Sequence, residues 1–167
     1  MSGVKLTDIV EKMNLKNLTP EVDITEREVL VPDVNRPALQ LAGFFDHFDL
    51  NRVQIIGNVE CAYLETLTEE RRLEIYQKLL EHKVPCIIFS NELQPDESFI
   101  EIAQKNDIPV FGTCKKTSSF MGELIRWLNV KLAPCISIHG VLVDVYGVGV
   151  LIMGESGIGK SLSLIHI

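Results

Sequence analysis

The chain has 167 residues, of which 46% are hydrophobic and 23% are charged, enough to bury one core and to begin a second domain. Its formal net charge is −7, from 16 Lys and Arg against 23 Asp and Glu. Because no block of basic residues occurs, nucleic acid and anionic membranes are unfavourable partners. Charged residues such as Lys5, Asp8 and Lys12 interrupt any apolar run in residues 1–20. This pattern predicts neither a signal peptide nor a membrane span, and hence a cytoplasmic protein.

Short apolar strands alternate with helical patterns in the first half of the chain. Thr7 is expected to cap a helix whose apolar face carries Ile9, Val10 and Met13. Residues 28–31 predict a strand. Pro37 at a first turn and Gly43 at an end are typical of a short helix between them. Residues 53–56 predict a buried strand.

The alternation continues to residue 128. Thr68 is expected to cap a helix, which is followed by a strand at 86–89, a helix at 96–104 and a strand at 109–111. The helix after Thr68 has an apolar stripe of Leu73, Tyr76, Leu79 and Leu80, and the helix at 96–104 places Phe99, Ile100 and Ala103 inward. Another helix is expected to begin at Ser118 or Ser119 and to bury Phe120, Leu124 and Leu128. The β-α-β-α-β order predicts a layered α/β domain with a parallel sheet.

The pattern changes after residue 128. Residues 129–134 resemble a connection, and two β runs around Gly147 predict a hairpin between residues 136 and 153. We therefore expect an N-terminal α/β domain at 1–128, a linker at 129–134 and the start of a second domain at 135–167. Doubly wound nucleotide-binding proteins more often enter a phosphate loop from a parallel strand, so the hairpin favours another architecture.

A phosphate-binding motif follows the hairpin. The run Gly154, Glu155, Ser156, Gly157, Ile158, Gly159, Lys160 and Ser161 matches G-x-x-x-x-G-K-[ST] at every fixed position. A chance match in a chain of this length has a probability of about one per cent at ordinary residue frequencies. Glycines let the backbone N–H groups of such a loop surround phosphate oxygens, the lysine reaches the terminal phosphates, and the serine hydroxyl can bind Mg²⁺. A glycine-rich turn without a ligand is the alternative.

The motif lies close to the last residue of the sequence. Only Leu162 to Ile167 follow it, and a stable helix behind a phosphate loop needs more residues than this. The sequence therefore predicts a fragment of a nucleotide-binding domain, with little activity of its own.

Three stretches together resemble one family. Residues 33–44 (Asp-Val-Asn-Arg-Pro-Ala-Leu-Gln-Leu-Ala-Gly-Phe), residues 132–134 and residues 139–161 are similar to HPr kinase/phosphorylase of bacteria. The resemblance implies an N-terminal α/β domain of regulatory or unassigned role and a C-terminal kinase domain related in fold to phosphoenolpyruvate carboxykinase. It also implies that ATP or pyrophosphate phosphorylates a serine of the phosphocarrier protein HPr, that phosphorolysis removes the phosphate, and that a homohexamer thereby controls carbon catabolite repression.

The resemblance assigns roles to some residues and leaves others in doubt. It implies that Gly154 to Ser161 hold the phosphates, that Ser161 touches Mg²⁺, and that His139 and Lys160 are active-site residues. Family members commonly have an acidic residue and a long helix where Leu162 to Ile167 stand, and a basic residue where Cys135 stands. The family's paired aspartates and its later metal-binding glutamate do not occur in this sequence.

Several residues also have simpler interpretations. Without the resemblance, His139 would be a structural histidine, and Asp144 the solvent-facing member of an alternating strand. Residues 33–35 can form an Asx turn, and residues 117–119 with Lys115 and Lys116 can cap a helix or bind an anion. The remaining histidines have no metal-ligand spacing. They are His47, His82 and His166.

The cysteines favour a reducing compartment. Cys61, Cys86, Cys114 and Cys135 stand far apart without a C-x-x-C pair, which predicts buried thiols and neither a zinc site nor a disulfide framework. A second function class stays open: a non-enzymatic α/β ligand-sensing or interaction module with a remnant phosphate loop. A generic P-loop ATPase or GTPase is a weaker third, because of the hairpin.

Overall fold

The computed structural model describes residues 3–134 and 140–153. The chain divides into two compact units, Met1–Ala133 and Pro134–Ile167, and each is described by itself. The division at 1–128, 129–134 and 135–167 remains a prediction, since it concerns domains and these units are defined by contacts within the chain.

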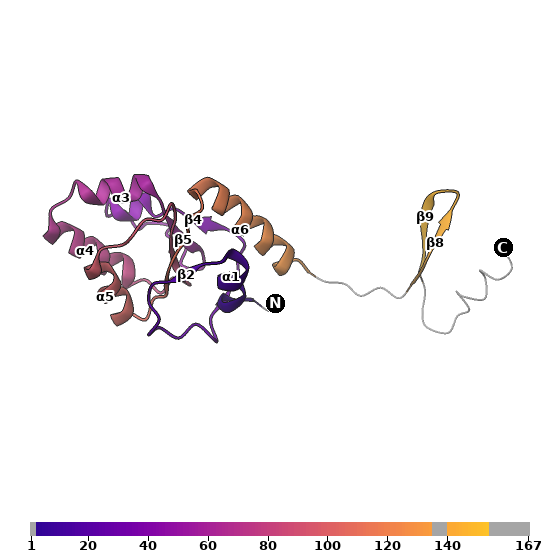
Figure 1. Cartoon of the computed structure of the whole chain (residues 1–167), viewed down its shortest axis with the longest axis horizontal. Helices are drawn as coiled ribbons and strands as arrows, with labels where there is room; N and C mark the ends of the chain where they lie inside the picture. The colour runs from indigo at the N-terminus through magenta and orange to yellow at the C-terminus, as the bar shows by residue number, and fades with distance from the viewer. Residues whose placement is uncertain (1–2, 135–139, 154–167) are drawn as a thin grey trace. The chain divides into compact units, whose positions relative to one another are not determined.

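The first unit is built on a five-stranded sheet in the order β2-β7-β6-β5-β4 (Figure 1). Four of its strands are parallel, and β2 pairs antiparallel with β7 at one edge. A separate two-stranded sheet joins β1 and β3. The strands of this unit are β1 (Val4–Lys5), β2 (Lys16–Asn17), β3 (Glu28–Val29), β4 (Val34–Asn35), β5 (Val53–Ile56), β6 (Ile87–Phe89) and β7 (Val110–Gly112).

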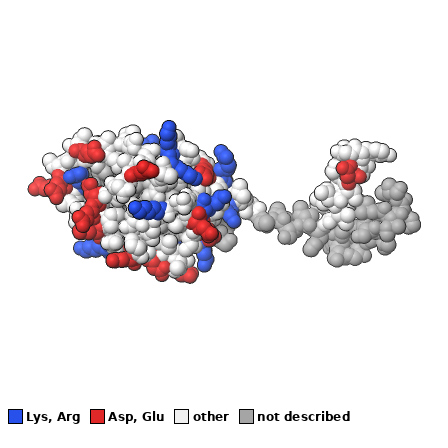
Figure 2. Space-filling view, in the orientation of Figure 1, with Lys and Arg blue, Asp and Glu red and all other residues white. Residues whose placement is uncertain are grey.

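Helices connect the strands and cover both faces of the sheet. They are α1 (Leu6–Met13), α2 (Ala38–Leu41), α3 (Asn58–Glu65), α4 (Glu69–Leu80), α5 (Glu97–Lys105) and α6 (Thr117–Leu132). Within the described residues, none of them combines the length and the apolar character needed to cross a membrane. Acidic and basic side chains both occur on the face of this unit shown in Figure 2, and the acidic ones are most frequent toward its left and lower edges.

Two apolar clusters lie on opposite faces of the sheet. On one face, Ile55, Ile88 and Phe111 pack with side chains of α1 and α6. On the other, Ile56 and Phe89 pack with side chains of α2, α3, α4 and α5. Successive side chains of a strand point to opposite faces, so a strand buried on both sides needs an uninterrupted apolar run. Strands β6 and β7 supply apolar side chains to both faces, and β5 is apolar except for Gln54. Gln54 is buried, and it accepts a hydrogen bond from Asn35 and donates one to the Arg52 carbonyl. The result is three layers.

Most of the predicted elements are confirmed, and β5 has the predicted bounds, residues 53–56. Thr68 caps α4, its hydroxyl accepting a hydrogen bond from the Arg71 N–H at 3.4 Å. The predicted cap at Thr7 is wrong: α1 already begins at Leu6, whose N–H donates to the Arg27 carbonyl at 2.8 Å. Pairing of β1 with β3 holds the chain up to Lys5 and thereby sets the start of α1.

The sheet differs from the predicted parallel one because sequence patterns missed β2. Both of its residues are exposed, so no apolar alternation marks it. Helix α3 was also missed, since Val59 and Tyr63 stay exposed at 68% and 39%. Helix α6 continues through residues 129–132, which were expected to form a connection. Its buried positions Phe120, Leu124 and Leu128 are as predicted.

The described part of the second unit is the predicted hairpin. Strand β8 (Gly140–Val145) pairs antiparallel with β9 (Val148–Met153). The two turn residues, Tyr146 and Gly147, both have positive φ, 52° and 81°, as a two-residue type I′ turn requires. The Gly147 N–H donates to the Asp144 carboxylate at 2.7 Å, so Asp144 is an exposed strand residue that also fixes the turn.

The two units should differ in stability. We predict that hydrogen exchange of the 167-residue chain shows strong protection of the amides in β5, β6 and β7 and weak protection across residues 141–153. The central strands share two packed clusters, whereas an isolated two-stranded hairpin is marginal in water. Uniform strong protection of residues 141–153 in a monomeric sample would contradict this prediction.

Candidate functional site

The predicted phosphate loop, Gly154 to Ser161, lies outside the described residues, and so does His139. The structure does describe the hairpin that joins them. Gly140, which follows His139, is paired with Met153, which precedes Gly154. The two chain segments that carry the predicted site therefore leave the hairpin at the same end.

The hairpin is apolar on both faces. On one face the cross-strand pairs are Val141 with Ile152, Val143 with Val150, and Val145 with Val148. On the other face Leu142 pairs with Leu151, and Leu142 is 73% exposed. A hairpin that is solvated on one face alternates apolar and polar residues. Here Asp144, opposite Gly149, is the one charged residue of the two strands, and the face that carries it also has Leu142, Leu151 and Met153. Such a composition suits a hairpin that further structure covers on both sides.

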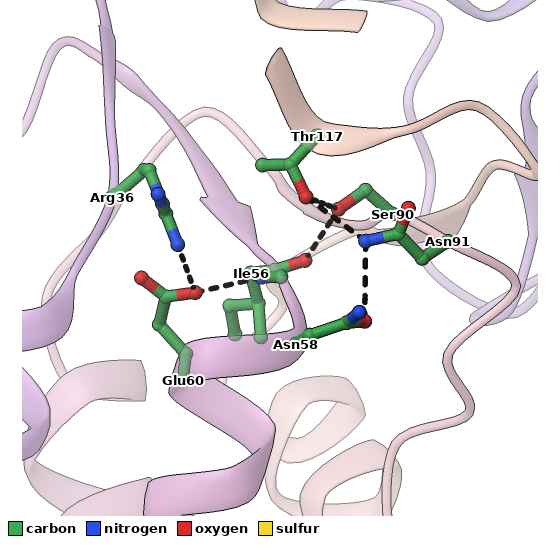
Figure 3. Close-up of polar contacts among 8 residues, drawn as sticks. Arg36, Ile56, Asn58, Glu60, Ser90, Asn91 and Thr117 are labelled. Atoms are coloured by element: carbon green, nitrogen blue, oxygen red, sulfur yellow. Dashed lines mark hydrogen bonds and ion pairs between the residues drawn. The ribbon is translucent and has the colours of Figure 1, made fainter. Parts of the chain in front are cut away.

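A second group of polar residues gathers at the carboxyl ends of the parallel strands (Figure 3). Glu60, near the start of α3, has a side chain that is 1% exposed. Its Oε2 accepts hydrogen bonds from the Arg36 Nη2 at 2.8 Å and from the Gly57 N–H at 3.0 Å. The carboxylate thereby caps α3 and ties it to the chain after β4. This is one half of a capping box, since Gly57 has no side chain with which to reciprocate.

The remaining members link β5 and β6 to α6. The Ser90 hydroxyl donates to the Ile56 carbonyl at 3.1 Å and lies 2.7 Å from the Thr117 hydroxyl. The side-chain amide of Asn91 donates to Thr117 Oγ1 and to Asn58 Oδ1, each at 3.1 Å. Ligands of open α/β sheets bind outside these strand ends. Here every buried side-chain polar atom of the described residues has a partner, and the hydrogen bonds of this group tie the strand ends to α3 and α6.

This network revises three predictions. Lys116 is the N-cap of α6, and its side chain makes no capping hydrogen bond, so the predicted capping by residues 117–119 is wrong. The Thr117 hydroxyl instead bonds to Ser90 and Asn91, which follow β6. Lys115 forms an ion pair with Glu123 at 2.6 Å. Asn35 donates to Gln54 on the adjacent strand at 2.8 Å, in place of the expected Asx turn.

Sequence analysis missed Glu60, Ser90 and Asn91. Two signals could have found them. A glutamate three residues after Gly57 matches half of a capping box, and polar residues that directly follow the apolar run of β6 mark the carboxyl end of a buried strand. In the residues that the structure describes, no group of three His, Cys, Asp or Glu side chains could hold a metal ion.

Comparison with known proteins identifies the family. The family described as "HPr Serine kinase N terminus" matches residues 4–128. The chain belongs to the HPr serine kinase family. The family described as "HPr Serine kinase C-terminal domain" matches residues 130–166. The first match covers most of the first unit, and the second includes the hairpin and the predicted phosphate loop.

Curated relatives carry the name HPr kinase/phosphorylase. The chain is 60% identical over 161 residues to that of Lachnoclostridium phytofermentans, covering 96% of this chain and 52% of the relative. It is 46% identical to that of Caldicellulosiruptor bescii, covering 92% and 49%, and 38% identical to that of Bacillus subtilis, covering 96% and 52%. The chain thus spans about half the length of the curated relatives it matches.

A solved structure also aligns with most of the chain. It comprises the CBS and DRTGG domains of the regulatory region of Clostridium perfringens pyrophosphatase, complexed with diadenosine tetraphosphate. The alignment covers 73% of this chain and 46% of that chain, at 21% identity and a TM-score of 0.49. At this level the similarity carries no inference about the ligand or activity of the present chain.

Removing the Glu60 carboxylate should destabilise the first unit. We expect Glu60→Ala to lower the free energy of unfolding by about 2 kcal/mol, because it leaves the buried Gly57 N–H without its acceptor and removes the partner of the partly exposed Arg36 guanidinium. Glu65→Ala, at the exposed end of the same helix, should change it by less than about 0.5 kcal/mol. Urea unfolding followed by circular dichroism measures both. Equal effects of the two substitutions would show that the Glu60 contacts contribute nothing.

The thiols differ in burial, which corrects the prediction of buried cysteines. Cys86 is buried and Cys61 half-buried, but Cys114 is exposed. Burial raises the pKa of Cys86 to about 12. Burial, together with the nearby carboxylate of Glu60, raises the pKa of Cys61 to about 11. Since the thiolate is the nucleophile, both are unreactive at neutral pH. The fourth cysteine, Cys135, lies outside the described residues.

Alkylation can verify this difference. With N-ethylmaleimide at pH 7.5, peptide mass spectrometry should show modification of Cys114 in the native chain and of Cys61 and Cys86 only after unfolding in urea. Both protected thiols stay protonated until the pH approaches their raised pKa values. Modification of native Cys86 at the rate of Cys114 would refute the burial described here.

Proposed function

We propose that the whole protein phosphorylates a serine of HPr, with ATP or pyrophosphate as donor, and removes that phosphate by phosphorolysis. One observation carries this proposal: the complete motif Gly154 to Ser161 directly follows β9, inside the segment that matches the HPr serine kinase C-terminal domain. The curated relatives are named HPr kinase/phosphorylase, which supports the same reaction pair.

The register of the hairpin supports a shared site for His139 and the phosphate loop. Each is attached by one peptide bond to a member of the Gly140–Met153 pair. Consecutive Cα atoms are about 3.8 Å apart and paired strands about 5 Å apart, so the Cα atoms of His139 and Gly154 can be at most about 13 Å apart. An imidazole on a side chain of ordinary length can then contact a phosphate held by the loop.

Each residue of the predicted site has a proposed role. Backbone N–H groups of Gly154 to Gly159 surround the phosphate oxygens, Lys160 neutralises the terminal phosphate, and the Ser161 hydroxyl binds Mg²⁺. Mg²⁺, when bound, offsets the negative charge of the phosphates. His139 donates a hydrogen bond to a phosphate oxygen or transfers a proton, because imidazole titrates near neutral pH.

The wider setting is part of the same proposal. HPr is the protein partner, the complete enzyme assembles as a homohexamer in the cytoplasm, and the reaction pair controls carbon catabolite repression. Support comes from the family membership and from the predominance of acidic residues in the chain, which suits a protein substrate better than a nucleic acid.

The roles of Lys160 and His139 can be separated in the full-length enzyme. Lys160→Ala should slow both the kinase reaction and phosphorolysis, with a loss of several kcal/mol of transition-state stabilisation, because a preorganised charge is lost at the transferring phosphate. It should also weaken nucleotide binding. His139→Ala should also slow both directions, spare nucleotide affinity more, and alter the pH profile between pH 6 and 9. Rates in both directions and equilibrium nucleotide binding measure these effects.

The control for both variants is Lys12→Ala, at an exposed position of α1, which should behave as the wild type. If His139→Ala has wild-type rates and pH dependence, the histidine is structural. If Lys160→Ala retains full transfer to HPr, the assignment of the phosphate loop is wrong, and a non-enzymatic sensing module with a remnant loop becomes the better description.

A further inference from the structure

We propose that a cavity at the amino-terminal edge of the sheet binds a small organic anion with an apolar body. The cavity has a volume of about 540 Å³. Its walls come from the segments that precede β5, β6 and β7, together with residues around β3. It therefore lies at the edge opposite to the polar network of Figure 3, and it is formed entirely by residues of the first unit.

One wall of the cavity is held in place by Arg27. Its Nε donates to the Asp23 carbonyl at 2.8 Å, and its Nη2 donates to the Asp107 carbonyl at 2.7 Å. The same guanidinium pairs with the Asp107 carboxylate at 2.5 Å. These contacts join the turn before β3 to the loop between α5 and β7. The wall is thus preorganised, which lowers the entropic cost of binding a ligand.

The charge available to a ligand is positive. The pairing with Asp107 neutralises Arg27. The other two cations of the lining, Lys83 and Lys105, form no ion pair with any side chain that the structure describes. Only Glu28 opposes them, and its carboxylate already accepts a hydrogen bond from the Gly3 N–H at 3.2 Å. The lining therefore carries one net positive charge, from Arg27, Lys83 and Lys105 against Glu28 and Asp107. In a chain of net charge −7, this local excess of positive charge attracts an anion.

The lining is also apolar. Val84 and Ile108 are buried core residues at 2% and 1% exposure, whereas Leu30 and Leu50 are exposed at 58% and 40%. Ligand sites are typically concave, lined mainly by apolar side chains with a few polar groups, and about 300 to 1,000 Å³ in volume. The exposed leucines beside two lysines therefore favour an anion that carries an apolar group over inorganic phosphate alone.

Compensation of helix dipoles does not account for both lysines. Lys105 lies in the last turn of α5, where a cation is favourable. Helix α4 has its own last-turn cation, Lys78, which does not line the cavity. Lys83 comes after the C-cap of α4, Glu81. It is therefore placed by the loop that forms the cavity, and Lys78 provides a matched control.

The anionic group can be a phosphate or a carboxylate, and a titration distinguishes them. Phenyl phosphate and 3-phenylpropionate are added separately to the ¹⁵N-labelled 167-residue chain, with inorganic phosphate and benzyl alcohol as controls that lack one half of the chemistry. We expect saturable changes in the amide chemical shifts of residues 83–84 and 105–108 with at least one of the two probes. The probe that binds more tightly shows whether the site prefers a phosphate or a carboxylate.

Substitutions test whether the cavity is responsible. The double substitution Lys83→Gln with Lys105→Gln should weaken binding at least tenfold, Leu50→Ser about threefold, and Lys78→Gln not at all. The proposal is overturned if neither probe produces saturable shifts, if inorganic phosphate produces the same shifts, or if Lys78→Gln weakens binding as much as the double substitution does. Unchanged thermal unfolding of each variant confirms that the fold is intact.

Discussion

Burial of one sheet on both of its faces is the constraint on which the first unit depends. Strands β5, β6 and β7 are short, yet nearly every residue in them is buried, so each strand contributes to both apolar clusters at once. A strand of this kind cannot face water on either side, and the helices on the two faces are therefore obligatory. The same constraint leaves little place for polar side chains inside the sheet: Gln54 is buried there and has hydrogen-bond partners, as a buried polar group requires.

The two edges of the sheet differ in what their polar groups do. At the carboxyl edge, Glu60 accepts hydrogen bonds from Arg36 and the Gly57 N–H. Ser90 bonds to Thr117 and to the Ile56 carbonyl. Together these contacts join three strand ends and two helices into one frame. At the amino edge, Lys83 and Lys105 are left beside a cavity with exposed leucines. Open α/β sheets usually bind ligands at the carboxyl ends of their strands, whereas the site proposed for this unit lies at the amino ends.

Sequence analysis succeeded where one signal dominates. Short runs of mainly apolar residues located β5 and β6, the fourfold spacing of Phe120, Leu124 and Leu128 located α6, and Gly147 located the turn of the hairpin. It failed where tertiary contacts decide. The start of α1 depends on pairing between β1 and β3, β2 is polar and lies at an edge, and the contacts of Glu60 and Thr117 join residues distant in the sequence. The phosphate loop stays a prediction, which sequence alone can make because the motif occupies eight consecutive residues. The role proposed for His139 rests on the family and on the hairpin register.

The central claim is that the segment after β9 binds phosphates in the complete enzyme. The most direct measurement is hydrogen exchange of the full-length protein, followed by mass spectrometry of peptides that cover residues 154–161, with and without pyrophosphate and Mg²⁺. A cradle of backbone N–H groups around phosphate oxygens predicts that pyrophosphate slows exchange in these peptides and that Lys160→Ala abolishes the effect. Exchange that pyrophosphate leaves unchanged at residues 154–161, in a preparation that still phosphorylates HPr, would contradict the account.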